Sequence, residues 1–271
     1  MTMMARVTRG NRCPICNGDT WCLIGRSIIL CMRTVSQRTK TLKGGEVAYM
    51  HPHPDPDKRA IFEPRPARKT PQVNVKRVLN DWYRAYGNPG LDNLAKRLGV
   101  TLRSLEELEF QYAGSYHNTW GIPMKDGYGN YIGIRMRNLV GNKWAITGSQ
   151  AGIFIPKLHA MRRMFIVEGP TDTAAGLTIG LYTIGRPSCS GGVTHIVDHV
   201  KRNNIQEVVL VSDNDDPGIR GAKDLQQWLK VPSCILLLPC KDLREFIKFG
   251  DKSTIDSMIE QLVWTQPKEV K

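Results

Sequence analysis

The sequence predicts an α/β protein with a mostly parallel sheet in its second half and a small metal-binding domain at its N-terminus. From residue 164 onward, short apolar runs alternate with helix-like segments, beginning with MFIVEG and TDTAAGLTIG and continuing through EVVLVSDND and PGIRGAKDLQQWLK. This alternation is typical of parallel strands joined by right-handed crossover helices. Four of the seven cysteines lie within the first 31 residues, which indicates metal ligands rather than a disulfide framework.

The charge of the chain favours an anionic partner. Its 271 residues include 38 Lys and Arg against 25 Asp and Glu, a formal net charge of +13, and nucleic acid is the simplest partner for such an excess. No run approaches the roughly 18 apolar residues of a membrane span. The first residues, MTMMARVTRGNR, lack the apolar segment of a signal peptide. We therefore expect a cytoplasmic protein without a membrane partner, and the lack of a GxxxxGK[ST] loop argues against an ATPase motor.

The N-terminal segment CPICNGDTWCLIGRSIILC predicts a zinc ribbon. A CxxC knuckle followed by strand-like SIILC is typical of this fold, in which four ligands stabilise a domain too small to bury a sufficient core. We expect the ribbon to occupy residues 1–48 and to bind one Zn²⁺. Cys22 has the least regular spacing, and His51 or His53 is its alternative; a CxxC redox pair is a second reading, but no βαβ pattern surrounds it. The predicted ligands are Cys13, Cys16, Cys22 and Cys31.

The middle of the chain predicts a linker followed by a mixed subdomain. Residues 49–72 are rich in proline and charge, which denies them regular structure. Apolar periodicity then returns, and VKRVLNDWYRAYG, LDNLAKRLGV and TLRSLEELEFQYA predict three helices, with Thr101 and Ser104 as possible caps of the third. The glycine-rich segment NTWGIPMKDGYGNYIGIRMRNLVGNKWAITGS predicts a hairpin or small sheet.

Carboxylates follow several of the apolar runs. Glu168 ends MFIV, Asp213 and Asp215 follow VVLVS, Asp242 follows CILLLP, and Asp172 lies one turn into the helix after Glu168. Taken singly, the aspartates would also serve as turn formers or helix N-terminal charges. Taken together they should converge, because the carboxyl ends of parallel strands meet at one edge of the sheet. Mutually repelling carboxylates are the usual ligands of Mg²⁺, so the sequence predicts a metal-dependent phosphoryl-transfer site.

A basic segment precedes the βα region. In GNYIGIRMRNLVGNKWAITGS, Arg135 and Arg137 fall on one face of a predicted strand, and Lys143 follows a Gly-Asn turn. Guanidinium groups bind phosphate bidentately, so this face would suit a triphosphate or a template backbone. The alternative is an ordinary solvated strand face.

The motifs EGPTD, SDNDDPG and KDLREF, in this order within residues 162–250, resemble the Toprim domain of bacterial-type primases, topoisomerases and some nucleases. The resemblance implies a cluster of ligands for Mg²⁺ (or Mn²⁺). Three of them, Glu168, Asp213 and Asp215, are implied to be catalytic as well. Primases often have a second acidic residue two places after the last aspartate, where this chain has Arg244. The implied ligands are Glu168, Asp213, Asp215, Asp172 and Asp242.

The basic segment resembles the amino-terminal half of the DnaG-type primase core, which precedes the Toprim domain in that family. The resemblance implies that Arg135, Arg137 and Lys143 bind nucleotide and template and that Lys143 takes part in catalysis. Many primases have a further lysine where this chain has Ala151 and Gly152. Primases also carry a zinc ribbon at their N-terminus, and topoisomerases lack the basic segment at this position.

These resemblances predict a DnaG-like primase of bacterial or phage type that synthesises short RNA primers during DNA replication. The implied partners are single-stranded DNA, ribonucleoside triphosphates and a replicative helicase on a separate chain, in the cytoplasm of the cell or of a phage host. The alternatives are a non-catalytic RecR-like recombination mediator and a Toprim nuclease. The predicted segments are a zinc ribbon (1–48), a linker (49–72), a basic subdomain of the primase core (73–161), a Toprim domain (162–250) and a C-terminal tail (251–271).

Overall fold

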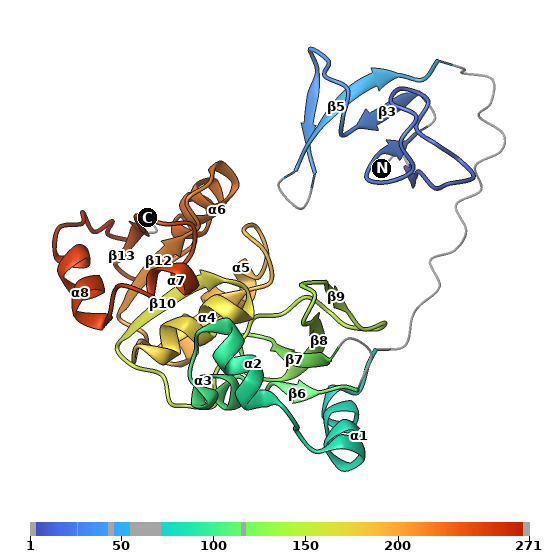
Figure 1. Cartoon of the computed structure of the whole chain (residues 1–271). Coiled ribbons are helices and arrows are strands. Elements are labelled where there is room, and N and C mark those ends of the chain that lie inside the picture. The colour runs from blue at the N-terminus through green and yellow to red at the C-terminus, as the bar shows by residue number, and fades with distance from the viewer. Residues whose placement is uncertain (1–3, 26, 43–45, 55–71, 115–117, 268–271) are drawn as a thin grey trace. The chain divides into compact units, whose positions relative to one another are not determined.

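The computed structural model divides the chain into two compact units, Met1–Lys69 and Thr70–Lys271 (Figure 1). Most of the predicted linker lies outside the residues that the structure describes. Within the described residues, no helix is long and apolar enough to cross a membrane. The described residues are 4–25, 27–42, 46–54, 72–114 and 118–267.

The N-terminal unit is an antiparallel sheet with strand order β1-β2-β3-β5-β4. The ribbon extends beyond its predicted end at residue 48, because β5 pairs with β3 from Cys31–Tyr49 to Ile28–Pro52 and so removes residues 49–52 from the predicted linker. Its apolar core is small and includes three cysteines beside Val7 and Ile29. The strands are β1 (Ala5–Arg6), β2 (Leu23–Ile24), β3 (Ile28–Cys31), β4 (Thr39–Thr41) and β5 (Val47–Pro52).

The second unit begins with the three predicted helices, α1 (Val75–Tyr86), α2 (Leu91–Leu98) and α3 (Leu102–Glu107). Thr101 caps α3, and its side chain accepts a hydrogen bond from the Ser104 N–H. The third helix is shorter than predicted. It stops because Glu109 adopts a left-handed conformation with φ of 58° and turns the chain into a strand.

An antiparallel sheet with the order β6-β7-β8-β9 follows, which confirms the predicted small sheet. The β7–β8 turn is closed by Asp126, whose carboxylate accepts hydrogen bonds from the backbone N–H groups of Tyr128 and Asn130. The strands are β6 (Gln111–Tyr112), β7 (Thr119–Lys125), β8 (Tyr131–Asn138) and β9 (Lys143–Ala145).

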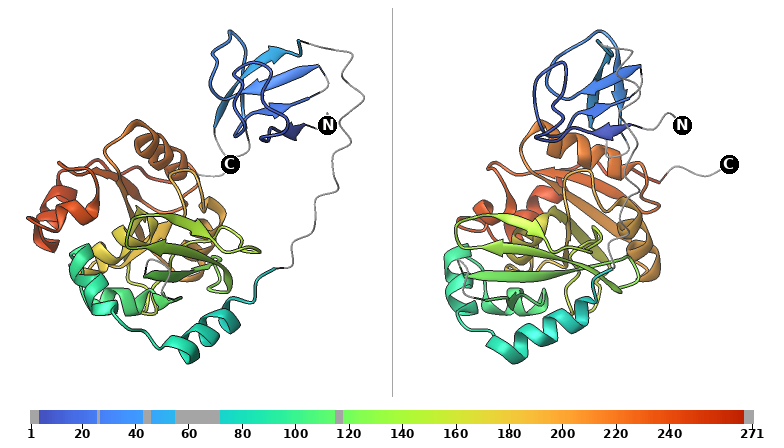
Figure 2. Two further views of the ribbon diagram at one scale, coloured as in Figure 1. Left: turned by 45° about the vertical axis from the view of Figure 1, so that its right-hand side comes forward. Right: turned by 90° about the vertical axis from the view of Figure 1, so that its right-hand side faces the viewer.

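The predicted parallel sheet is present, with the order β11-β10-β12-β13 and every pair parallel. Alternate side chains along each strand enter two separate cores. One core lies against α2, α3 and α4, and the other against α5 and α6, so that helices cover both faces (Figure 2). The elements are β10 (Arg163–Glu168), α4 (Gly169–Thr178), β11 (Thr183–Arg186), α5 (Val193–Arg202), β12 (Glu207–Ser212), α6 (Asp216–Gln226) and β13 (Ser233–Leu237).

The prediction of a separate C-terminal tail at residues 251–271 needs correction, because residues 252–260 form a helix that packs into this unit. After the short helix α7 (Leu243–Phe246), α8 (Lys252–Glu260) buries Ile255 and Ile259 in the core that contains α4. Thr265 then makes a bridge to Ser233 on the edge strand β13. The apolar spacing of these two isoleucines was a helical signal that the short length of the segment obscured.

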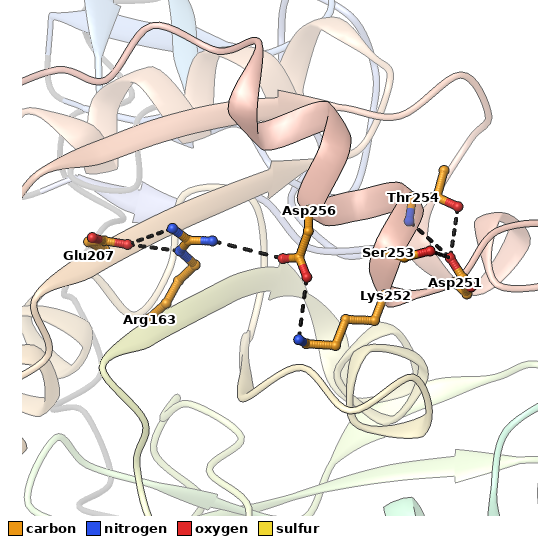
Figure 3. A network of polar contacts seen from close by, with 7 residues as sticks. All are labelled: Arg163, Glu207, Asp251, Lys252, Ser253, Thr254 and Asp256. Atoms are coloured by element: carbon orange, nitrogen blue, oxygen red, sulfur yellow. Dashed lines mark hydrogen bonds and ion pairs between the residues drawn. The ribbon is translucent and has the colours of Figure 1, made fainter.

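A polar network ties α8 to the sheet (Figure 3). Two nitrogens of Arg163, on β10, each lie 2.8 Å from one carboxylate oxygen of Glu207, on β12, and a third lies 3.8 Å from Asp256. Lys252 also contacts Asp256, at 3.3 Å. The guanidinium of Arg163 lies over the ring of Trp264 as well, so one side chain joins two strands, the helix and the segment after it.

Replacing this arginine should therefore destabilise the second unit. We expect Arg163→Met to lower the free energy of unfolding by about 1 kcal/mol, since the charge-assisted contacts are partly solvent-exposed. The matched control is Arg162→Met, because Arg162 is more exposed and approaches Glu207 only to 4.0 Å. Urea titrations monitored by circular dichroism would measure both, and equal midpoints for the two variants would contradict the assignment.

Candidate active site and metal centre

The four N-terminal cysteines converge as predicted. Their sulfur atoms all lie within 4.8 Å of one another, which is the arrangement of a four-thiolate metal site. Cys22 belongs to this group, whereas the ring of His51 is hydrogen-bonded to the Thr34 carbonyl at 2.9 Å. The geometry thus favours the cysteine over that histidine as the fourth ligand.

Backbone and side-chain donors surround these thiols. The N–H groups of Met32 and Thr34 point at Cys22 and Cys31, at 3.4 Å and 3.2 Å. Burial opposes a charge on Cys16, but hydrogen bonds from Gly18 and from the Arg33 guanidinium outweigh it and lower its pKa to about 6. Because thiolates rather than thiols bind zinc, this donor set fits Zn²⁺.

The carboxylates predicted from the sequence gather at the carboxyl edge of the parallel sheet. Glu168 is the last residue of β10, Asp213 follows β12, and Asp172 lies in the first turn of α4. Asp215 and Asp242 are the N-caps of α6 and α7 and accept hydrogen bonds from Gly218 and Glu245. The predicted convergence and the alternative capping role therefore both apply to these two aspartates.

These carboxylates disfavour each other's charged form. Burial, together with the neighbouring charges of Asp242 and Asp213, raises the pKa of Asp172 to about 7, against a hydrogen bond of 3.1 Å from the Arg244 N–H. Burial and the charges of Glu168, Asp242 and Asp215 together raise the pKa of Asp213 to about 6. An all-oxygen set of repelling carboxylates fits a hard divalent cation such as Mg²⁺.

Asp213 and Asp215 lie in the turn between the strand and the next helix, because β12 ends at Ser212 and α6 begins at Asp216. Among the described residues, only the four cysteines bring three or more possible metal ligands within 4.8 Å of one another.

The predicted basic residues occupy one face of β8 and β9. Arg137 pairs with Lys143 across the two strands, and Arg135 lies two residues before Arg137, so all three side chains leave the same face. This face lies toward the carboxylates: Lys143 is close enough to lower the pKa of Glu168, and Asp172 interacts with Arg137. Arg135 donates a hydrogen bond of 3.1 Å to the Pro187 carbonyl.

Arg137 is the most strongly desolvated of the three. Burial lowers the pKa of its guanidinium, and the neighbouring charge of Arg244 adds to the effect. Its Nε has no hydrogen-bond partner within the described ranges. A half-buried cation with an unused donor is well suited to bind an anionic ligand.

Arg186 is a site residue that the sequence analysis missed. It ends β11 directly beside Glu168 in the parallel register, and only 5% of it is exposed. Its guanidinium donates to the carbonyls of Gly191 and Gly221, and after burial it is the largest influence on the pKa of Glu168, which it lowers. The signal was present, because this arginine ends the apolar run LYTIG at the same edge as Glu168.

The comparisons with known proteins identify the fold. No family model and no curated protein matches the sequence. The Aquifex aeolicus primase zinc-binding and RNA polymerase domains match with a TM-score of 0.57 and 17% identity over 70% of this chain and 60% of that chain. A DnaG primase catalytic domain bound to single-stranded DNA matches with a TM-score of 0.54 and 13% identity, over 69% and 78%. The primase fragment of the bacteriophage T7 primase-helicase protein matches with 0.51 and 13%, over 95% and 100%.

The chain therefore has the fold of DnaG-type primases, with a four-cysteine N-terminal unit and a Toprim-type parallel sheet. The motifs from which this fold was predicted lie at the sites where the structure gathers its cysteines and its carboxylates. The fold prediction is confirmed.

The cysteine cluster should hold one zinc ion per chain. Elemental analysis of the purified protein measures this directly, and Cys16→Ser should lose the metal, since a thiolate ligand is replaced by a hydroxyl. Cys240→Ser is the matched control, because Cys240 lies near α7 and outside the cluster. Metal-free wild-type protein, or a Cys16→Ser variant that retains zinc, would contradict the assignment.

Proposed function

We propose that this protein is a DNA primase, which joins ribonucleotides on a single-stranded DNA template by nucleotidyl transfer. One observation carries the proposal: five carboxylates gather at the edge of the parallel sheet and a face of three basic side chains lies toward them. Charges of both signs at one place fit a reaction in which a triphosphate is bound and a phosphoryl group is transferred. The fold agrees with this function.

Glu168, Asp213 and Asp215 would hold Mg²⁺ (or Mn²⁺), with Asp172 and Asp242 completing the ligand set. When bound, the metal would neutralise the triphosphate and activate the primer 3′-hydroxyl. Arg186 would hold the Glu168 carboxylate in its ionised form at the end of β10.

The basic face would orient the substrates. Arg137 offers an unused donor in a desolvated setting, which favours a bidentate contact with a phosphate group. Lys143 is the member of this face whose charge lowers the pKa of Glu168, so it would place an incoming triphosphate against the carboxylates. Arg135 is held by the Pro187 carbonyl and would bind the template strand or the nucleotide from a more fixed position.

A single assay separates this proposal from its alternatives. The protein is incubated with single-stranded DNA, labelled ribonucleotides and Mg²⁺, and the products are resolved by size. A primase makes short RNA, a nuclease shortens the DNA, and a RecR-like mediator binds the DNA without changing it. We further expect the enzyme to act in the cytoplasm of a bacterium or phage host, beside a replicative helicase on a separate chain.

The carboxylate assignment is tested by Asp213→Asn. Loss of a metal ligand should lower primer synthesis by at least about 100-fold. The melting temperature without Mg²⁺ should stay the same or rise, because the change removes one of several repelling charges. Asp216→Asn, an exposed first-turn residue of α6, is the matched control and should keep its activity. Near-normal synthesis by Asp213→Asn would refute the metal assignment.

The division of labour between the two units gives a further prediction. A fragment of residues 73–271 contains the carboxylates and the basic face and should extend a pre-annealed RNA primer. It should initiate primers poorly and with less sequence preference, because the ribbon would contact template that the core does not reach. The measurement compares extension with initiation on templates of varied sequence. Initiation equal to that of the whole chain would exclude the ribbon as the sequence reader.

A further inference from the structure

Trp21 is an exposed aromatic side chain at the metal centre of the ribbon. It lies between Thr20 and the predicted ligand Cys22, and 65% of it is exposed. By contrast, Trp120 is only 2% exposed and belongs to the core of the second unit. A tryptophan side chain that is mostly exposed to solvent contributes little burial energy to the core of a small domain. Its position therefore needs another explanation.

The backbone at Trp21 is held in an unfavourable conformation. Its φ is 71°, and the Cys22 N–H donates to the Thr20 carbonyl at 2.9 Å, which together define a γ-turn of the rare, strained kind. A bulky residue with positive φ is a true outlier, and glycine or asparagine would fit there at less cost. Strain of this kind persists when the surrounding structure fixes it, often at a binding site.

The surroundings of Trp21 do fix it from both sides. The Arg33 guanidinium donates to the Thr20 carbonyl at 3.0 Å and to the Thr20 hydroxyl at 2.8 Å. On the other side, Cys22 is buried among the clustered thiols. Gly18 leaves the space that Arg33 occupies, since a Cβ at this position would collide with the guanidinium. The indole ring thus projects from a short segment that is anchored at both ends.

The charge of the ribbon favours an anionic partner such as nucleic acid. Residues 1–54 contain eight Arg and Lys but only two Asp and Glu. An exposed aromatic ring on a basic surface is the pattern by which proteins bind single-stranded nucleic acid, with the ring stacked on a base and the cations near phosphates. We propose that Trp21 is a base-stacking residue for single-stranded DNA. This inference rests on the proposed function only in taking the template strand as the ligand.

The test uses the full-length, zinc-loaded protein and a fluorescein-labelled single-stranded oligonucleotide, without nucleotides. Trp21→Asn should weaken binding by about 10-fold, within the range expected for one stacked base. Because asparagine tolerates a positive φ, this variant should keep its zinc and resist chelators at least as well as the wild type. Trp21→Phe should recover part of the affinity. Trp228→Asn is the matched control, since Trp228 is 63% exposed but lies in the other unit.

Salt separates stacking from charge in the same experiment. Affinity should fall steeply with salt for all variants, whereas the ratio between wild type and Trp21→Asn should stay nearly constant. Unchanged binding by Trp21→Asn, an equal loss in Trp228→Asn, or loss of zinc from Trp21→Asn would overturn the proposal. Failure of the wild type to synthesise RNA would refute the primase function but would leave this binding comparison intact.

Discussion

The central constraint on this structure is the repulsion among the carboxylates that the parallel sheet brings to one edge. Burial makes it worse, since it raises the pKa of Asp172, Asp213 and Glu168 together. The fold offsets it locally through the Arg244 N–H and through Arg186 beside Glu168. What keeps the carboxylates together is the rest of the unit, whose two apolar cores fix the strands that carry them.

The helices that follow the strands contribute to the same constraint. α6 packs so closely that a Cβ at Gly218 would crowd the Asp213 carbonyl, and one at Gly221 would collide with the backbone of Cys189. Two glycines three residues apart thus let the helix approach the loops that carry site residues. Arg186 then joins these parts, since it binds the carbonyls of Gly221 and Gly191 at once. Its buried guanidinium fixes the end of β11 where Glu168 needs a cation.

The sequence predicted those features that depend on local pattern. The βα alternation, the order of acidic motifs and the cysteine cluster all lie in short segments, and the structure has the predicted sheet and the cluster. What it did not predict depends on long-range packing. The contact of Arg186 with Glu168 depends on β11 lying beside β10, the strand β5 depends on its partner β3, and α8 belongs to the core through its contacts with the unit that contains α4.

The two units hold their functional side chains in place by different interactions. The second unit fixes its carboxylates with buried sheet and helix, which a chain of about 200 residues can supply. The ribbon has only a few buried side chains, and hydrogen bonds such as those of Arg33 to Thr20 add to its order. A metal ion bound by the four clustered cysteines would cross-link this short segment without covering it. Such anchoring allows a strained, solvent-exposed aromatic residue to persist beside Cys22.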